Sequence, residues 1–568
     1  MNKQKRLLLS ALITAVIAGL GYYVVLPPIN IYAQAFWGSL AFVVLVFGAA
    51  YVLIGSKAAV KTFFSGKGDK GFADKTAEKK KKTRERIVFF VCLGIPVVVL
   101  IVGNLLSSTF FNATAYSTII EVPEAVFEED MPENDIVTNI PLMDSASANI
   151  IGNRKLGELS AVVSQYQVNG TYSQINYGGI PRKVSSLEYV DFFKWLNNRD
   201  AGVPGYVSVD PVNSSADYVE FETPIKYTDS AYFEEDLNRT LRFSYPTKIF
   251  GTTMFELDEE GNPYYIVSCL SPKVGLFGGM DVSEVIIFNP CDKTSELYSV
   301  SDTPSWVDNV FSGSLASQKY DWYGTLQNGY WNSVIGNKDC KVTTDDYGYI
   351  VLGDDVWFFT GVTSVVSDES NIGFIISNAR TGEYKFYPVV GAEEYSAMGA
   401  AQGHVQEKGY TASFPSLINV SGEATYIMVL KDANGIVKMV ALVNVENYTI
   451  VATGSNQQEA KQAYLEELRR EGILGDDEEE SPSEEEAPKP TEISFVVKEI
   501  RFLTTAGETF IYLTGDDGNI YKKQVSEDES VLFIKGNDLI EGTYLETENK
   551  GIYQLVTWER YLAPGQGE

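Results

Sequence analysis

The chain is poor in the residue types on which much enzymatic chemistry depends. It has a single histidine, His404, and four cysteines in 568 residues. A Ser-His-Asp or Cys-His catalytic set would have to use His404, and its neighbours Gly403 and Val405 form no nucleophile motif. His-Glu-x-x-His, Cys-x-x-Cys and Gly-x-x-x-x-Gly-Lys-Ser/Thr are all absent. The sequence therefore predicts no catalytic residue, no metal site and no cofactor.

Basic side chains are scarce relative to acidic ones. The chain has 45 Lys and Arg against 75 Asp and Glu, a formal net charge of −30 at pH 7. Since a nucleic-acid backbone is held mainly by Lys and Arg, this balance argues against nucleic acid as a partner. Four cysteines in so long a chain also exclude a small disulfide-built scaffold. With 45% apolar and 12% aromatic residues, the chain has enough apolar side chains for several packed domains.

Three long runs contain no charged residue: Leu7–Leu26, Phe36–Ile54 and Ile87–Leu106. Each is close to the about 20 residues that an α-helix needs to cross the hydrocarbon core of a bilayer. The alternative for the first run is a cleaved signal peptide, with Lys3, Lys5 and Arg6 as its basic region. That run is long for a signal peptide, and a second run follows almost at once. Residues 1–108 are therefore predicted to be a three-span anchor, and spans without ionisable residues indicate no ion path.

Lysine and arginine are concentrated around the first two runs. The loop Lys57–Arg86 has eleven of them, including Lys79–Lys82. Residues 1–86 hold 14 basic and 4 acidic side chains, which leaves 31 basic and 71 acidic, a net charge of −40, for residues 87–568. Because positive loops stay in the cytoplasm, the N-terminus and this loop are predicted to be cytoplasmic and residues after 107 extracellular. The loop also fits contact with anionic lipid, which is favoured, or with a cytoplasmic partner.

The predicted fold class beyond the membrane is α+β, with antiparallel sheets and helices. A stalk (Thr109–Val137) and a first module are expected within 109–230. Further modules are expected over 231–302, 303–390 and 391–474.

Three helices are predicted from their caps. Ser185–Glu188 has the pattern of a capping box for a helix that continues through Leu196. A second helix is predicted to start at Thr303-Pro304. A third has a capping box at Ser455–Gln458 and stops at Gly472.

The modules share a layout of a helix followed by three or four strands. Their hairpins include DEEGNPYYIV (Asp258–Val267) and NARTGEYKFYPV (Asn378–Val389). Over Ala231–Leu468 this layout resembles tandem PepSY domains, small modules of secreted and membrane-anchored bacterial proteins. The resemblance implies a role in restraining or assisting peptidases at the cell surface. The whole arrangement also resembles membrane proteins of Gram-positive bacteria.

The C-terminal part divides into a linker and a small β domain. Residues 475–493 are rich in Asp and Glu and interrupted by prolines, so an extended linker is expected. Residues 494–562 contain five predicted short strands, which favours a small OB- or SH3-like barrel. The strands are Phe495–Leu503, Thr509–Thr514, Ile520–Val525, Val531–Lys535 and Ile552–Trp558. The barrel is interpreted as an interaction module for an unknown ligand.

Two further patterns bear on chemistry. Cys269 and Cys291 lie at the ends of neighbouring predicted strands, so a disulfide between them is considered beside the alternative of free thiols. Cys92 lies in the third span, and Cys340 has no predicted partner. The acidic pairs Asp345-Asp346, Asp354-Asp355 and Asp516-Asp517 fit hairpin turns, in which Asp is favoured for backbone reasons.

The function predicted from these patterns is non-catalytic. The chain is expected to be a multi-pass protein of the cell membrane and a scaffold or partner-binding component of the bacterial envelope. Its predicted partners are the lipid bilayer and an envelope protein or the cell wall, and its oligomeric state stays open. One alternative is a modulator of a surface peptidase or wall hydrolase, through the PepSY-like modules. Another is a carboxylate-based glycosidase, because the required spacing of two carboxylates is spatial.

Overall fold

The computed structural model describes most of the chain. The described residues are 3–64, 72–131, 143–212, 214–344, 346–474, 491–505, 508–525, 529–546 and 552–561. They form two compact units, Met1–Glu471 and Gly472–Glu568. The expected linker lies outside the described residues over 475–490, as does Asp345, and the side chains of Lys79–Lys82 are also outside them.

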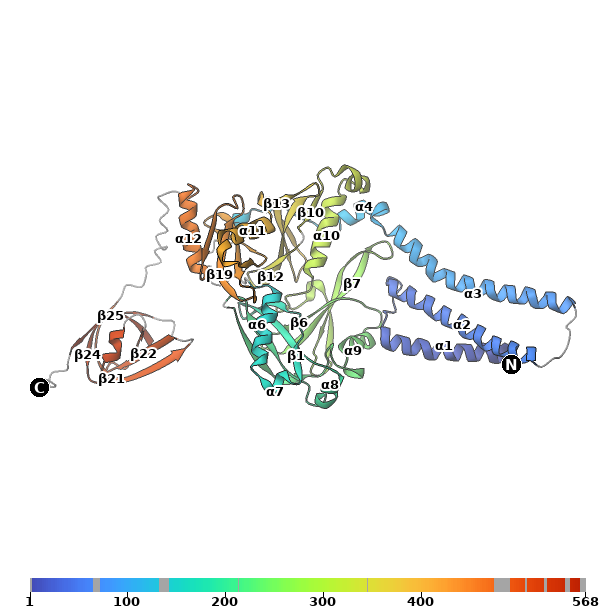
Figure 1. Ribbon diagram of the computed structural model, residues 1–568, viewed down its shortest axis with the longest axis horizontal. Coiled ribbons are helices and arrows are strands. Elements are labelled where there is room, and N and C mark those ends of the chain that lie inside the picture. Colours follow the sequence, from blue (N-terminus) through green and yellow to red (C-terminus); the bar gives the residue numbers. More distant parts are fainter. Residues whose placement is uncertain are drawn as a thin grey trace. The chain divides into compact units, whose positions relative to one another are not determined.

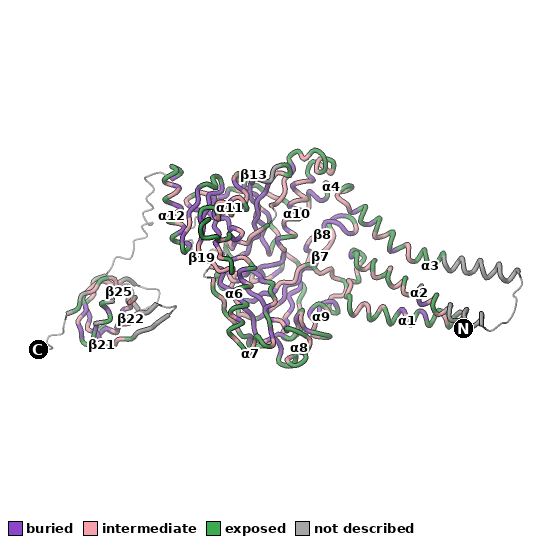
Figure 2. The backbone as a smooth tube through the Cα atoms, in the orientation of Figure 1, coloured by how far each residue is buried: buried purple, intermediate pink, exposed green. Residues whose placement is uncertain are grey.

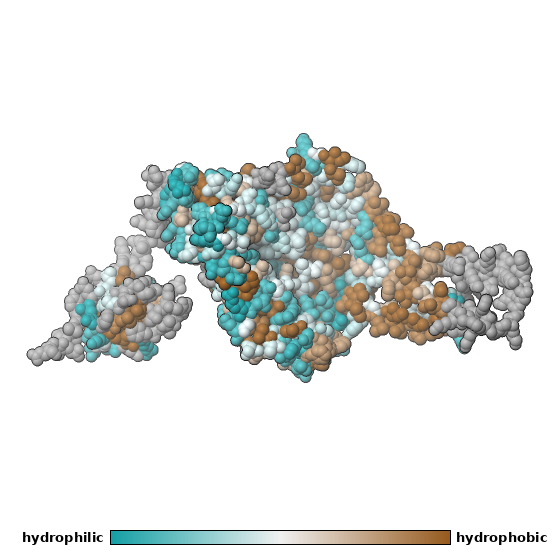
Figure 3. Space-filling model, in the orientation of Figure 1, coloured by the Kyte–Doolittle hydropathy of each residue, from teal (hydrophilic) through white to brown (hydrophobic). Residues whose placement is uncertain are grey.

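Three N-terminal helices are long and apolar enough to cross a membrane (Figures 1 and 3). They are α1 (Lys3–Val25), α2 (Gln34–Phe64) and α3 (Phe72–Leu106). Their apolar stretches are Gln4–Val25, Gln34–Ile54 and Ile87–Leu106. In each, almost all the apolar side chains face outward, as expected of helices that use lipid as their solvent. The three apolar helices predicted from the sequence are thus confirmed, and they fit a multi-pass membrane protein.

Hydrogen bonds attach the C-terminal end of α1 and the loop after it to the β-rich part of the unit. After α1 the chain turns at Leu26, whose φ is 53°. The Leu26 carbonyl accepts a hydrogen bond from Arg242 Nε at 2.9 Å, and the Tyr23 carbonyl accepts one from Arg239 Nε at 3.2 Å. Both arginines belong to α9 (Leu237–Ser244). The following loop adds a backbone bond from Ile29 N to the Pro246 carbonyl at 2.7 Å.

Four antiparallel sheets follow (Figure 1). The first contains β1 (Tyr166–Val168), β2 (Ser173–Tyr177), β3 (Ile180–Tyr189), β4 (Val203–Asp210) and β5 (Ser215–Ile225). The second is a meander of β6 (Ile249–Leu257), β7 (Pro263–Val274), β8 (Gly278–Phe288) and β9 (Ser295–Ser299). Helices α6 (Ser145–Gly157), α7 (Ser160–Val163) and α8 (Phe192–Asn198) accompany the first sheet, and the 3₁₀ turns η2 (Phe233–Glu235) and η3 (Val300–Asp302) flank the second.

The third and fourth sheets are also antiparallel and are also accompanied by helices. The third contains β10 (Lys341–Thr343), β11 (Gly348–Leu352), β12 (Asp355–Ser364), β13 (Ser367–Asn378), β14 (Tyr384–Tyr387) and β15 (Gly391–Ala392). The fourth contains β16 (Thr411–Ala412), β17 (Ser416–Val420), β18 (Glu423–Lys431), β19 (Val437–Asn444) and β20 (Val451–Gly454). Their helices are α10 (Gly313–Leu326), α11 (Glu394–His404) and α12 (Gln457–Arg470), with the short turns η4 (Asn332–Gly336) and η5 (Gln406–Lys408).

The sheets share hydrophobic cores in pairs (Figure 2). One core joins the first and second sheets and includes Leu187, Val207, Val267 and Ile286. Another joins the third and fourth sheets and includes Phe374 and Tyr426, among other fully buried side chains. Because the two sheets of each pair share one continuous hydrophobic core, they pack together and are not separate domains.

The segment expected to be a stalk is built into the third sheet. It contains α4 (Thr109–Ser117) and α5 (Phe127–Asp130). Glu124 forms a parallel bridge with Phe386 of β14, so this stretch extends the sheet by one short strand. Phe127 and Met131 are buried in the core of the third and fourth sheets. Burial of these apolar side chains, which the local sequence did not reveal, holds the segment against the body of the unit.

Two predicted helix starts are wrong. Ser185–Glu188 lies in strand β3, and helix α8 starts later, where Asp191 caps the backbone N–H groups of Phe193 and Lys194. β3 pairs with β1, β2 and β4, so Ser185–Glu188 is part of a central strand and caps no helix, whereas Phe192, Phe193 and Leu196 do lie in helix α8. Residues 303–312 are a loop, and α10 starts at Gly313 with Ser312 as its cap. The third predicted helix is confirmed as α12, although Asn456 and not Ser455 is its cap.

The C-terminal unit is a closed five-stranded barrel, as expected. Its strands are β21 (Thr491–Thr505), β22 (Glu508–Gly515), β23 (Ile520–Gln524), β24 (Leu539–Glu546) and β25 (Ile552–Tyr561), joined in the order β21-β22-β23-β25-β24. β23 and β25 are parallel and the other neighbours are antiparallel. The strand predicted at Val531–Lys535 is wrong, because residues 529–533 form the 3₁₀ turn η6 (Glu529–Phe533), and β24 was not predicted.

Candidate functional site

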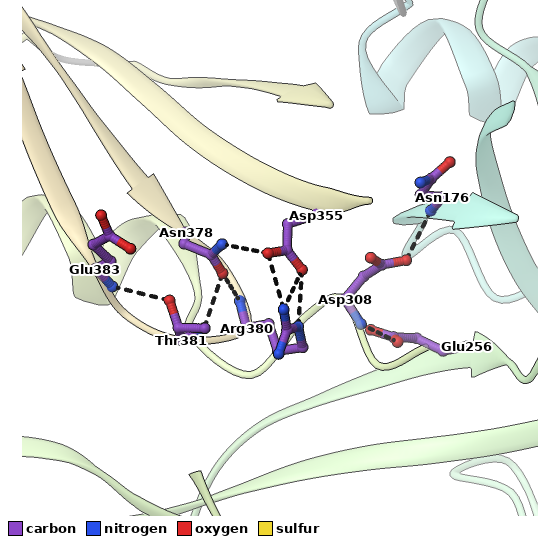
Figure 4. Close-up of polar contacts among 8 residues, drawn as sticks. All are labelled: Asn176, Glu256, Asp308, Asp355, Asn378, Arg380, Thr381 and Glu383. Atoms are coloured by element: carbon purple, nitrogen blue, oxygen red, sulfur yellow. Dashed lines mark hydrogen bonds and ion pairs between the residues drawn. The ribbon is translucent and has the colours of Figure 1, made fainter. Parts of the chain in front are cut away.

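Two buried acidic residues are hydrogen-bonded neighbours where the loop before α10 passes the first and second sheets, with the Glu256 carboxylate at the backbone N of Asp308 (Figure 4). Glu256 on β6 is fully buried and Asp308 on the loop is 3% exposed. Glu256 Oε2 accepts a hydrogen bond from Asp308 N at 2.9 Å, and Oε1 accepts from Asn309 N and Nδ2, each at 2.8 Å. Asp308 Oδ2 accepts from Asn176 N on β2 at 2.7 Å. We call Glu256, Asp308 and Asn309 the acidic junction.

The same loop contacts three of the four sheets. Asn309 Nδ2 also donates to the Gln174 carbonyl of β2 at 2.8 Å. The Val310 carbonyl accepts from Ser268 Oγ of β7 at 2.8 Å. Val310 N and Phe311 N both donate to the Ala379 carbonyl, just after β13, at 2.9 and 2.7 Å. The acidic junction therefore holds the first, second and third sheets together through one short stretch of backbone.

Burial controls the protonation of this pair. Removal from water raises the pKa of Glu256 from 4.5 to about 7, although three N–H donors oppose the shift. The pKa of Asp308 is raised by burial and by the nearby charge of Glu256. Two carboxyl groups in such surroundings do not readily ionise together, so near neutral pH the pair retains a proton.

An ion pair lies beside the acidic junction (Figure 4). Arg380 Nε donates to Asp355 Oδ1 at 2.8 Å and Arg380 Nη2 donates to Asp355 Oδ2 at 2.9 Å, a two-pronged contact. Asn378 Nδ2 also donates to Asp355 at 2.8 Å. The Arg380 charge opposes the rise in the pKa of Asp308. Asp355, predicted to be a turn residue, thus fixes the hairpin turn that starts at Asn378.

A third buried carboxylate, that of Glu394, belongs to a hydrogen-bond network that joins the third and fourth sheets. Glu394 at the start of α11 is fully buried. Its Oε1 accepts from Gly361 N at 2.6 Å, and Asn371 Nδ2 donates to Tyr426 Oη at 3.1 Å. Tyr426 Oη in turn donates to the Ala392 carbonyl at 3.0 Å. Burial raises the pKa of Glu394 to about 7. Like Glu256, Glu394 therefore accepts a hydrogen bond from a backbone N–H group and stabilises the packing of neighbouring segments.

The barrel has a groove that, unlike the buried acidic sites, is open to the surface. It has a volume of about 680 Å³ and is lined by Ile493, Ser494, Glu541, Gly542, Thr543, Thr557 and Trp558. These residues come from β21, β24 and β25, where Gly542 faces both Ile493 and Trp558 in the strand register. A Cβ at Gly542 would lie 2.0 Å from the Thr557 carbonyl oxygen, so glycine is required for the close approach of β24 and β25.

The groove offers an aromatic ring, hydroxyl groups and one carboxylate. Thr543 Oγ1 and Thr557 Oγ1 lie 2.7 Å apart, and Ser494, Glu541 and Thr557 are exposed. No Lys or Arg is among the described residues that line it. This set suits an uncharged ligand with many hydroxyl or amide groups better than a phosphate, which requires cations.

The cysteines and the histidine considered in the sequence do not gather in one site as these buried acids and groove residues do. Cys269 is buried on β7, and Cys291 follows β8 with its Sγ donating to the Thr223 carbonyl at 3.1 Å. Both are free thiols in the structure. His404 is exposed at the end of α11. Among the described residues, no group of three or more His, Cys, Asp or Glu is placed to hold a metal ion.

Sequence reasoning missed Glu256, Asp308 and Glu394 because an isolated acidic residue in an acidic chain carries no signal. The available hint was the apolar context: Glu256 follows Met254-Phe255, and Asp308 lies between Val307 and Val310.

The comparisons with known proteins are negative: no protein-family model matches this chain, and no curated protein matches it.

Proposed function

We propose that this chain is a non-catalytic, membrane-anchored scaffold of the bacterial envelope that uses its C-terminal barrel to bind the cell wall. The N-terminus and the 57–86 loop are cytoplasmic in this proposal, and residues after 107 are outside. The positive charge of residues 1–86 and the net charge of −40 beyond them support that orientation.

The observation that carries the proposal is how the buried acids are used. Glu256 accepts three hydrogen bonds, two from the backbone N–H groups of Asp308 and Asn309 and one from the Asn309 side chain. Glu394 accepts one from the backbone N–H of Gly361. A general acid or nucleophile has to reach a substrate. Carboxylates engaged in this way instead stabilise a rigid body of four sheets, which suits a scaffold and argues against the glycosidase alternative.

The barrel is the part that we propose to bind a ligand. Its strand order, its parallel β23–β25 pair and the turn η6 between β23 and β24 support assignment as an OB barrel over an SH3-like one. OB barrels bind oligonucleotides and oligosaccharides. With Trp558, three hydroxyl side chains and no Lys or Arg among the described residues of the groove, a glycan strand fits better than a nucleic acid.

Co-sedimentation of the detergent-solubilised full chain with purified peptidoglycan tests this proposal. Trp558→Ala and Thr557→Val are expected to weaken binding at least about tenfold, which corresponds to about 1.4 kcal/mol. Tyr448→Ala, an exposed tyrosine after β19 in the other unit, is the control and is expected to leave binding unchanged. A wild-type chain that stays in the supernatant would overturn the proposal, as would equal binding by all variants.

The PepSY-like layout favours a second candidate, a modulator of a surface peptidase or wall hydrolase. In the second to fourth sheets, α9, α10 and α11 each precede an antiparallel sheet. In this case the full chain is expected to change the turnover of a peptidase captured with it by cross-linking in cells. Unchanged rates for every captured peptidase would remove this candidate.

A further inference from the structure

An apolar surface lies where the third span leaves the membrane. It consists of Phe110, Phe111, Tyr330, Trp331, Val334 and Ile335, which we call the aromatic patch. Five of these side chains are strongly exposed: Phe110 by 46%, Phe111 by 56%, Trp331 by 64%, Val334 by 54% and Ile335 by 74%. Water-exposed apolar groups of this size are unusual when contiguous, and they mark a surface that contacts something else.

The patch is contiguous although its two halves are more than 200 residues apart in the sequence. The Phe110 ring centroid lies 5.1 Å from that of Tyr330 and 5.8 Å from that of Trp331. Val334 and Ile335 follow in η4, and Asn337 directly after it has a φ of 47°. That left-handed residue ends the helical turn η4, on which both aliphatic side chains are exposed.

The position of the patch relative to the third span is fixed by hydrogen bonds. Asn112 Nδ2 donates to the Leu106 carbonyl, the last of α3, at 2.6 Å. Tyr116 Oη donates to the Ser107 carbonyl at 2.7 Å, and its ring lies 4.9 Å from that of Trp322 on α10. Helices α4 and α10 therefore hold the patch beside the end of α3, and the hydrophobic surface of the spans continues towards α4 (Figures 1 and 3).

The composition of the patch matches the boundary between lipid headgroups and acyl chains. Trp and Tyr concentrate at this boundary because their rings are amphipathic, and Phe and aliphatic side chains enter the adjoining acyl region. The patch contains no charged residue. Its continuity with a membrane-spanning helix favours lipid over any other occupant.

We infer that the aromatic patch inserts into the leaflet from which α3 emerges, so that the four-sheet body rests on the bilayer and is not only tethered to it. This contact fixes the tilt of the body on the membrane. The inference does not depend on the glycan proposal or on which side of the membrane the body occupies.

Quenching of tryptophan fluorescence by brominated lipid tests the inference. The full chain is reconstituted in liposomes of phosphatidylethanolamine and phosphatidylglycerol with plain or brominated acyl chains. The seven tryptophans of the chain make a difference measurement necessary, so the spectrum of Trp331→Phe is subtracted from that of the wild type. The difference signal is expected to lose most of its intensity in brominated lipid.

Two further variants separate insertion from other causes. In the Trp331→Phe background, Ile335→Trp is expected to restore a quenched signal. Tyr448→Trp is the matched control. Tyr448 is 49% exposed and lies four residues after β19, a strand that is far from α1, α2 and α3 in Figure 1, so its signal is expected to be unquenched. An unquenched signal at both 331 and 335 would overturn the inference, because the patch would then be covered by protein or water. Quenching at 448 as strong as at 331 would also overturn it.

Discussion

Glu256 accepts a hydrogen bond from the backbone N–H of Asp308, 52 residues further along the chain, at 2.9 Å with both groups buried. The contact joins the strand β6 to the loop before α10, and through that loop three of the four sheets. Burial raises the pKa of both acids, and the charge of Glu256 adds to the rise for Asp308. The stability of the fold is therefore expected to depend on pH at the acidic junction.

The first prediction concerns Glu256→Gln. The pKa of Glu256 is about 7 in the folded chain, above its ordinary value of 4.5. An acid with a raised folded pKa contributes its full stability below the unfolded value, and this contribution is lost as pH rises through 7. The thermal midpoint of the wild type is therefore expected to fall between pH 5 and pH 8, and that of Glu256→Gln is expected to fall less.

At pH 5 the same variant is expected to be less stable by about 1–3 kcal/mol, because an amide N–H₂ replaces one acceptor oxygen. Circular dichroism melts of the full chain at several pH values provide the measurement. Wild-type and variant curves that run parallel across this range would show that Glu256 does not titrate.

The second prediction concerns Lys183→Met. Burial lowers the pKa of Lys183 from 10.5 to about 8, against the opposing charge of Asp144. A base with a lowered folded pKa destabilises the fold when charged, and stability recovers as pH rises from 8 towards 10.5. Lys183→Met is therefore expected to be more stable than the wild type at pH 7 by about 1–3 kcal/mol, and the difference is expected to shrink by pH 10.

Lys431→Met is the matched control for that change. Lys431 Nζ donates to Asp144 Oδ2 at 2.7 Å and to Ser147 Oγ at 3.1 Å, which ties the fourth sheet to the cap of α6. Its removal is expected to lower the thermal midpoint at pH 7. If both lysine variants shifted the midpoint in the same direction, desolvation of Lys183 would not be the cause.

The third prediction concerns the contact between the β7–β8 hairpin and the third span. Ser107 Oγ, one residue after α3, accepts from Leu276 N at 2.8 Å and from Phe277 N at 3.0 Å. Ser107→Ala is expected to speed amide hydrogen exchange in peptides that contain 276–277 and to leave peptides of β13 unchanged. Ser108→Ala, which removes only a bond to the Leu105 carbonyl of its own helix end, is the control. Equal exchange at 276–277 in all three chains would contradict the contact.

The fourth prediction concerns the cysteines. Burial raises the pKa of Cys269 to about 12 and that of Cys291 to about 11, so both thiols are expected to react slowly while the chain is folded. After unfolding without reductant, mass spectrometry is expected to find all four cysteines alkylated. Two alkylations that become four only after reduction would instead establish the disulfide predicted from the sequence.

Local patterns in the sequence predicted several features correctly. Runs without charge identify α1, α2 and α3 because the bilayer imposes a length and a composition on any helix that crosses it. The hairpin turn at Asn378–Gly382 is encoded by residues that favour turns, including a glycine with a φ of 75°. Helix α12 carries its own cap, with Asn456 accepting from Glu459 N.

Local sequence patterns gave wrong predictions where the tertiary packing of a segment determines its secondary structure. Ser185–Glu188 has the pattern of a capping box but lies in β3, where it pairs with β1 and β4 and where Ser185, Ser186 and Leu187 are buried. Pro304 suggested a helix start, but residues after it form the loop that carries Asp308 and Asn309. Near Val531, apolar residues suggested a strand where the chain forms a 3₁₀ turn.

The sequence by itself determined which helices are long and apolar enough to cross a membrane, the antiparallel sheets, and the barrel at the C-terminus, because each depends on composition and short-range periodicity. Only the tertiary structure decided that Glu256 meets Asp308, that Glu394 faces Gly361, and that Phe110 joins Trp331 in one exposed patch. These contacts join residues 33 to 221 positions apart. No local propensity specifies such partners; they are fixed by how the sheets pack and by the cost of leaving a buried polar group unpaired.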